Sequence, residues 1–207
     1  RLSRGLGDVY KRQIEIIEDE FGTSIDSIFS QFSEPIAAAS IAQVHFAKIK
    51  SSNTEIDVAV KVLRPEIEKI INQEMERLEW LTTFMENFTE FQRLRPNSII
   101  KKAKEVIKFE LDLRYEAAAA SELSENTNMD ESFYVPKVYW DKVTQKILTM
   151  EKIIGVPADK IDELNEKKVN KKQAAENLII NFLRQSIRDG YFHCLLYTSP
   201  SPRDNRT

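Results

Sequence analysis

The sequence predicts an α+β fold, in which a small antiparallel sheet carries helical insertions and is followed by the first helix of a further, helical region. Two segments rich in β-branched residues indicate the sheet. They are IAQVHFAKI (41–49) and IDVAVKVL (56–63), joined by a polar SSNTE turn as in an antiparallel hairpin. Long segments on both sides of the hairpin have apolar residues at helical spacing, which indicates amphipathic helices.

The elements around the hairpin follow from spacing and breakers. Residues 14–32 are predicted to form two short helices broken at Gly22, with Ser24 as the cap of the second. A turn of small residues precedes the hairpin, and residues 65–91 return to helical spacing after it.

The second half of the chain is predicted to add one long helix, two strands and a final helix. The long helix covers about 99–123, with Asn97 or Ser98 as its cap. Gly190 is expected to stop the last helix. The two strands and the final helix are placed at residues 133–139, 146–150 and 171–189.

Both ends of the chain are predicted to be foreign to the natural protein. DNA that can encode CLLYTSPSPRD (194–204) has an opposite strand that, extended by three bases, can encode SRGLGDVYKRQ (3–13). Opposite strands of one oligonucleotide at the two ends of a gene indicate a sequencing adapter. We therefore expect residues 1–13 and 194–207 to be adapter-derived and only 14–193 to be natural.

Excluding these ends changes the composition of the chain. The single cysteine, Cys194, lies in the excluded part. A disulfide framework is therefore not expected, and we expect a cytoplasmic location. Six of the 30 Lys/Arg and two of the 33 Asp/Glu lie in these ends, so 24 basic and 31 acidic residues remain, a net charge of −7. This negative charge argues against nucleic acid as partner. No apolar run approaches the ~20 residues of a membrane span. Too few glycines remain for a glycine-rich phosphate loop: Gly22, Gly155 and Gly190.

The second strand ends in VAVK, which looks like the protein-kinase strand whose lysine holds the α- and β-phosphates of ATP. In kinases a helix carboxylate pairs with this lysine, because an ammonium among apolar residues would otherwise tend to lose its proton. Lys61 is the candidate lysine here. VAVK alone leaves open the alternative of a surface lysine on an edge strand.

A glutamate-bearing helix, FELDLRYEAAAA, supplies candidate partners. On one continuous helix, Asp112 and Glu116 are four residues apart and share a face, whereas Glu110 points elsewhere. The alternative is a solvated acidic face balanced by neighbouring basic residues. The four small residues 117–120 favour close packing of this helix against another element.

Taken together, the motifs resemble the UbiB family of atypical kinase-like proteins. The motifs are PIAAASIAQVH, VAVKVLRP, ELDLRYEA, VPKVYW, LTMEKIIG and IRDGYFH, in this order. The resemblance covers nearly all of residues 14–193. It implies a kinase-like N-lobe with a helical insertion over 14–152 and the start of a C-lobe over 153–193.

The resemblance also implies an alanine-rich loop in place of the glycine loop of kinases. Ala37, Ala38 and Ala39, followed by Ser40, would lie over the nucleotide. Alanine does not take positive φ cheaply, so the loop should be stiffer than a glycine loop and its amides differently aimed. In the family this suppresses protein phosphorylation, and Ala39→Gly is expected to shift the full-length parent towards autophosphorylation.

The remaining site residues are carried over by motif. Lys61 would bind nucleotide with Glu116 as its partner, while Glu110 and Asp112 match the family's Glu-x-Asp pair. Val44 and Ala59 would form the roof of the adenine pocket, and Met150, Glu151 and Lys152 the hinge. His45 is assigned no role.

The implied cofactors are ATP or ADP, with Mg²⁺ in the intact parent. In the family the catalytic aspartate and the magnesium ligands follow the GYFH motif, where this chain passes from His193 into the predicted adapter. We therefore expect no catalytic and no metal-binding residue here, and an inactive fragment. The parent would support ubiquinone biosynthesis, peripheral to the inner membrane, with membrane lipid or quinone-biosynthesis proteins as partners. The sequence predicts no oligomeric state.

Two other functions stay open at this point. One is a non-enzymatic acidic helical interaction module in which VAVK is accidental. The other is a peptide or small-molecule kinase with an unusual loop. The position of Lys61 relative to Glu116 separates the module from both kinase-like functions.

Overall fold

The structure, a computed structural model, describes residues 2–51 and 54–190, and the side chains of 9–50, 54–89 and 91–190. The chain divides into two compact units. The first contains the described residues up to Ala118 together with Val138–Lys152, and the second contains Ala119–Lys137 and the described residues from Ile153 onward. The predicted adapter ends remain a prediction; α1 (Leu2–Phe21) is continuous across residue 13.

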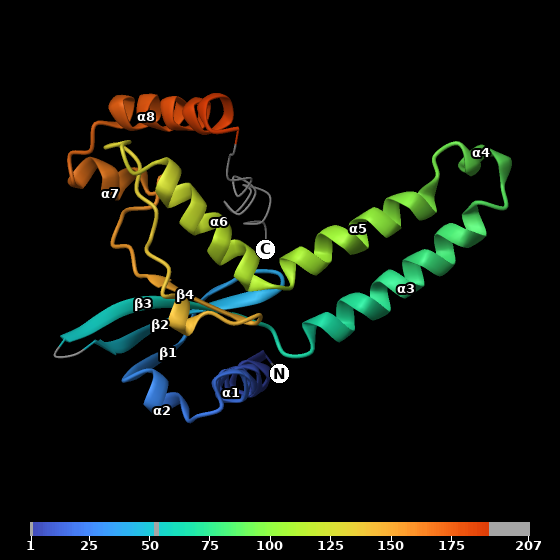
Figure 1. Cartoon of the computed structure of the whole chain (residues 1–207), viewed down its shortest axis with the longest axis horizontal. Coiled ribbons are helices and arrows are strands. Elements are labelled where there is room, and N and C mark those ends of the chain that lie inside the picture. The colour runs from blue at the N-terminus through green and yellow to red at the C-terminus, as the bar shows by residue number, and fades with distance from the viewer. Residues whose placement is uncertain (1, 52–53, 191–207) are drawn as a thin grey trace. The chain divides into compact units, whose positions relative to one another are not determined.

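The first unit is built on a four-stranded antiparallel sheet whose strands lie side by side in the order in which they follow along the chain (Figure 1). The predicted hairpin is present, and its strands pair from Ala42 with Leu63 to Ser51 with Thr54. This confirms the predicted α+β class. The strands are β1 (Gln31–Ala38), β2 (Ala42–Ser51), β3 (Thr54–Leu63) and β4 (Ile147–Glu151).

Strand β1 differs from the prediction, which placed a turn of small residues before the hairpin. Its sequence QFSEPIAA contains a proline and alanines, which have low β propensity, so the segment has no strand signal of its own. The proline is accommodated because β1 is an edge strand with irregular register on both sides of Pro35. The actual turn begins at Ala39.

One face of the sheet packs against α1 and α2 (Ile25–Ile28), where the core lies. Val58, Val60 and Val62 of β3 are fully buried, and each contributes about 1.5–3 kcal/mol relative to an exposed side chain. The two helices are separated at Gly22, as predicted, because its φ of 66° favours glycine. Ser24 occupies the predicted cap position of α2, although its hydroxyl bonds Ser27 Oγ rather than the backbone.

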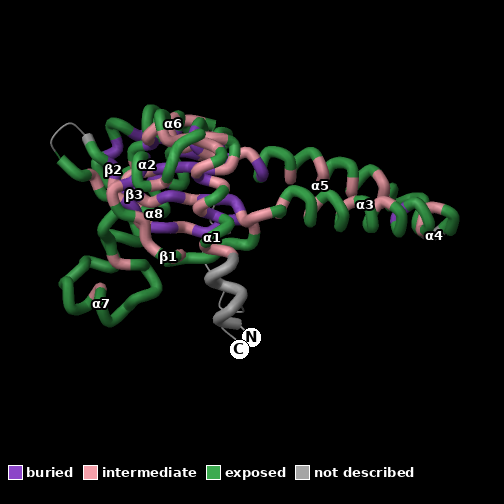
Figure 2. Tube along the Cα trace, turned by 90° about the horizontal axis from the view of Figure 1, so that it is seen from below, coloured by how far each residue is buried: buried purple, intermediate pink, exposed green. Residues whose placement is uncertain are grey.

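The helical insertion consists of α3 (Ile67–Met85), α4 (Thr89–Gln92) and α5 (Pro96–Glu110). Helices α3 and α5 lie side by side and extend away from the sheet (Figure 1). Figure 2 shows that buried residues gather in the sheet, whereas α3 and α5 are mostly exposed or half-buried. The predicted caps of α5 are wrong: Arg95 is at the cap position, with φ of 47°, and Asn97 lies inside the helix.

The predicted helix over 99–123 is two helices, because α5 ends at Glu110 and α6 (Leu113–Asn126) begins after a break. Asp112 lies in the break, and its Oδ1 accepts the Arg114 amide at 3.1 Å, as an N-cap side chain does. Leu113 N donates to Gln145 O at 2.9 Å and fastens the start of α6 to the segment before β4.

The second unit contains the later part of α6, α7 (Ile161–Glu166) and α8 (Lys171–Leu183), which continues as a π-helical turn at Arg184–Arg188. Helix α8 was predicted, whereas helix α7 was not. Asn170 caps α8, because its side-chain oxygen accepts a hydrogen bond from Gln173 N. The strand predicted at 133–139 is wrong, since its only pairing among the described residues is an isolated bridge from Val138 to Met150. Along the described part of the chain, no helix combines the length and apolarity needed to cross a bilayer.

Candidate nucleotide site

The face of the sheet opposite the core carries the predicted lysine. Side chains alternate along β3, so the valines point into the core while Ala59 and Lys61 point to the other face, where both are half-buried. Across the strands Lys61 lies between Val44 and Leu148, and Ala59 lies between Phe46 and Met150. The predicted roof residues are thus close to the lysine: Val44 lies opposite it on β2, and Ala59 lies two residues before it on the same face of β3.

Lys61 and Glu116 form the ion pair that separates the open hypotheses. Lys61 Nζ lies 2.6 Å from Glu116 Oε2, although 55 residues separate the two in the chain. The lysine and glutamate side chains are 22% and 27% exposed, so water and a ligand can still reach both. The next residue, Ala117, is fully buried and allows the close approach of α6 that the small residues predicted. The helix is therefore not merely a solvated acidic face.

Among the described residues, the other two acidic candidates form no ion pair with Lys61. Glu110 is exposed at the last position of α5. Asp112 holds the Arg114 guanidinium at 2.9 and 2.6 Å, and this contact holds the pKa of Asp112 below its ordinary value. The predicted shared face of Asp112 and Glu116 assumed one continuous helix, whereas α5 ends at Glu110 and α6 begins at Leu113, so Asp112 lies just before the helix that carries Glu116. The shared face itself stays a prediction.

The alanine segment is divided between a strand and a loop. Ala37 and Ala38 pair with β2, opposite Val44 and Gln43, and only Ala39 and Ser40 lie in the β1–β2 loop, residues 39–41. Among the described non-glycine residues, positive φ occurs only outside this segment, at Glu66, Arg95 and Lys168. The loop thus turns without the left-handed conformation that a glycine loop would use.

Arg64 is a residue of this region that the sequence analysis did not single out. Its Nε and Nη2 donate to the carbonyl oxygen of Ala39 at 3.2 and 3.1 Å, and its backbone N donates to Ile41 O at 2.8 Å. Its place in VAVKVLRP, three residues after the lysine, was the available signal.

The predicted hinge lies at the end of β4. Met150 pairs with Ala59, so it extends the row that contains the roof residue. Glu151 pairs with Val58. Lys152 turns back to β3, where its N donates to Asp57 O at 3.3 Å and its ammonium lies 4.2 Å from the centroid of the Phe46 ring. The backbone amide of Lys152 is thus already engaged.

His45 lies on the core face, away from Lys61. Its Nδ1 lies 3.0 Å from Ser33 O and its Nε2 lies 3.1 Å from the side-chain amide of Gln13. Burial lowers the pKa of His45, against a smaller opposite effect of the bond to Ser33. A neutral ring that donates from Nδ1 has a lone pair at Nε2. If the side-chain amide of Gln13 is turned over, its nitrogen, which otherwise has no partner among the described residues, donates a hydrogen bond to this lone pair.

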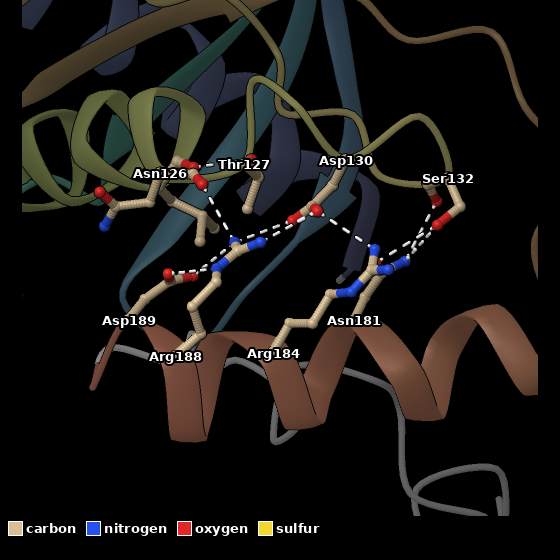
Figure 3. Close-up of polar contacts among 9 residues, drawn as sticks. Asn126, Thr127, Asp130, Ser132, Asn181, Arg184, Arg188 and Asp189 are labelled. Carbon is tan, nitrogen blue, oxygen red and sulfur yellow. Dashed lines mark hydrogen bonds and ion pairs between the residues drawn. The ribbon is translucent and has the colours of Figure 1, made fainter.

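The second unit holds a separate polar cluster around Asp130 (Figure 3). The Asp130 carboxylate accepts Arg184 Nη1 at 3.1 Å and Arg188 Nη1 and Nη2 at 3.1 and 2.9 Å. These contacts, chiefly the bond from Arg188, lower the pKa of Asp130. Arg188 also binds Asp189 and Asn126 O, so the cluster joins the end of α6 to the π-helical turn. Sequence reasoning missed it, because Asp130 is 54 and 58 residues from the two arginines.

The region after Gly190, where the resemblance places the catalytic and metal-binding loops, lies outside the described residues. Within the described residues, no group of three or more His, Cys, Asp or Glu side chains is placed to hold a metal ion.

Comparison with known families gives one extended match. The model of the ABC1 atypical kinase-like domain matches residues 8–198. The chain is 38% identical over 182 residues to a probable protein kinase UbiB of Pseudomonas paraeruginosa (strain DSM 24068 / PA7), covering 87% of this chain and 34% of that protein. It is 38% identical over 185 residues to the probable protein kinase UbiB of Pseudomonas putida (strain ATCC 700007 and equivalents, F1), covering 88% and 34%. The corresponding protein of Pseudomonas fluorescens (strain SBW25) is 37% identical, with the same coverage. The chain thus spans about a third of the length of these relatives.

Proposed function

Because the chain belongs to the ABC1 atypical kinase-like family, to which the resemblance to UbiB proteins pointed, we propose that it carries the nucleotide-binding half of a kinase-like ATP site. The observation that carries the proposal is the ion pair of Lys61 and Glu116 on the open face of the sheet. An accidental VAVK match would not bring a carboxylate from the predicted helix to this lysine.

In this proposal the Lys61 ammonium binds the α- and β-phosphates, and Glu116 keeps the ammonium charged and aimed. Ala59 and Val44 would contribute apolar surface to the adenine pocket. The Met150–Lys152 segment would form the hinge at the edge of that surface. Ala39 and Ser40, at the turn between β1 and β2, lie over the phosphates.

Mg²⁺ would neutralise charge on the phosphates when nucleotide is bound. We assign none of the described residues to the metal, so the chain by itself is expected to bind ADP or ATP weakly and to be inactive. The role in ubiquinone biosynthesis and the association with lipid or quinone-biosynthesis proteins are proposed for the whole parent.

Weak binding is best tested by a nuclear magnetic resonance titration of the chain with ADP at millimolar concentration. The amide signals of Val44, Ala59 and Lys61 should shift, and Lys61→Met should weaken binding by about tenfold, as expected for loss of a contact worth about 1.4 kcal/mol. Lys48→Met is the matched control, since Lys48 lies in the same sheet and pairs with Glu55 at 3.4 Å.

The proposal would be contradicted if ADP left the amide signals of these residues unshifted, or if Lys61→Met did not change the affinity for ADP. Either result would favour an interaction module. Tight, magnesium-dependent ATP binding by this chain would contradict the expectation that the metal ligands lie elsewhere.

A further inference from the structure

Arg64 connects the strand that carries Lys61 to the loop that the proposed function places over the phosphates. It follows β3 directly, and it holds the β1–β2 loop through its backbone as well as its side chain. The backbone N bonds Ile41 O, while two side-chain nitrogens converge on Ala39 O. Both ends of this three-residue loop are therefore attached to the residue after β3.

The loop adds one bond of its own, from Ala39 N to Ala42 O at 2.9 Å. Ala39 is thus held at its amide by the start of β2 and at its carbonyl by Arg64. Since none of residues 37–41 has positive φ, the loop is not locked by a left-handed residue. Its position depends on these hydrogen bonds.

The use of arginine at this position is informative. A guanidinium offers five donors and usually binds a carboxylate or phosphate in a bidentate manner. Among the described residues Arg64 forms no ion pair, and two of its donors are directed at one neutral carbonyl. A lysine could supply only one compact donor group there and could not hold the carbonyl from two nitrogens.

We propose that Arg64 is a positioning residue for the nucleotide: it keeps the β1–β2 loop at a fixed distance from Lys61 by clamping the Ala39 carbonyl. This rests on the proposed nucleotide function, and it names the element that makes the loop stiff. The stiffness comes from the arginine clamp together with the alanines.

The clamp itself can be measured without nucleotide, by amide hydrogen exchange of the chain. Arg64→Ala should accelerate exchange at the Ala39 amide by about tenfold, and Arg64→Lys should give an intermediate rate. Arg77→Ala serves as control, because Arg77 is exposed and, among the described residues, forms an ion pair with Glu74, one turn away on α3. Exchange at Ala39 that is equal in the wild type and in Arg64→Ala would overturn the proposal.

The consequence for nucleotide is measured by the same ADP titration. Arg64→Ala should raise the Kd for ADP about fivefold, with Arg64→Lys between it and the wild type and Arg77→Ala unchanged. A loss of affinity without any change in exchange of the free protein would mean direct phosphate contact and would overturn the positioning role. Faster exchange at an unchanged Kd would overturn it too. If the wild type does not bind ADP, the proposed function fails, while the exchange result still decides whether the clamp exists.

Discussion

At the scale of single residues, the decisive feature is a charge pair placed where water can still reach it. Lys61 lies in a strand whose valines, at every second position, are buried in the core. The Lys61 side chain points to the opposite face of the sheet, where it forms an ion pair with Glu116. A fully buried pair would be costly to desolvate, and a fully exposed one would be screened and mobile. The intermediate exposure leaves the ammonium accessible to an anionic ligand.

The Glu116→Gln variant should separate ligand binding from stability. We expect the free energy of unfolding to fall by less than about 1 kcal/mol, because pairs that are partly exposed contribute little. ADP binding should weaken markedly, since the ammonium loses the carboxylate that orients it. The control is Glu55→Gln, which removes the partner of Lys48 in the same sheet. Equal effects of the two variants on ADP binding would contradict the special role of Glu116.

His45 should make stability depend on pH. Its pKa in the folded protein is below the ordinary 6.5, so below about pH 6.5 the unfolded chain binds more protons than the folded chain. The free energy of unfolding should therefore fall as the pH drops through this range, by up to about 1.4 kcal/mol per pH unit, and level off below the folded pKa. Urea denaturation between pH 5.5 and 7.5 measures the slope. His45→Gln should flatten it, and an unchanged slope in that variant would refute the assignment.

At the scale of elements, the α3–α5 hairpin is joined by side chains of a few polar residues. Asn97 binds Glu86 through both its backbone N and its Nδ2, at 3.2 and 2.7 Å, and its Oδ1 accepts Thr82 Oγ1 at 2.5 Å. Lys104 adds an ion pair to Glu79 at 2.6 Å. Because few apolar residues of these helices are buried, such contacts fix their pairing.

Asn97→Ala should therefore destabilise the hairpin by about 1–2 kcal/mol, the cost of leaving half-buried partners without their hydrogen bonds. Hydrogen exchange along α3 and α5 measures this locally. Asn87→Ala is the matched control, because Asn87 is exposed and its side chain bonds carbonyls of its own turn. The contribution of Asn97 would be refuted if both variants exchanged at the same rate.

At the scale of the whole molecule, the described residues of the second unit expose an apolar surface on α8. We call the α8 apolar surface the set Leu178, Ile179, Ile180, Phe182 and Leu183, all of which are at least 41% exposed. A hollow of about 680 Å³ beside it is lined in part by Phe133. Exposed apolar surface drives association in water.

The chain is therefore expected to self-associate at micromolar concentration. Replacing Leu178 and Ile179 by Glu should raise the monomer fraction measured by sedimentation velocity, because charges oppose burial of this surface. Lys172→Glu, at an exposed polar position of the same helix, should leave the distribution unchanged. A wild-type chain that is monomeric across this concentration range would contradict the expectation.

Much of this arrangement could be predicted from local signals in the sequence. The VAVK run singled out Lys61, and the breaker at Gly22 separated α1 from α2, because a short motif and backbone φ are properties of a few adjacent residues. The order of motifs indicated the family. Local propensity failed at β1, where an alanine- and proline-containing segment forms a strand only because β2 supplies its hydrogen bonds.

What only the tertiary structure decided is which distant residues meet. The resemblance named Glu116 as the partner of Lys61, but only the folded chain brings the two together, with Asp112 bound to Arg114 and the start of α6 fastened by the Gln145 carbonyl. The contact of Arg64 with Ala39 likewise depends on strand pairing across the sheet. Periodicity describes faces within one element. Contacts between residues 25 or 55 positions apart depend on how elements pack, and that is determined by the folded chain as a whole.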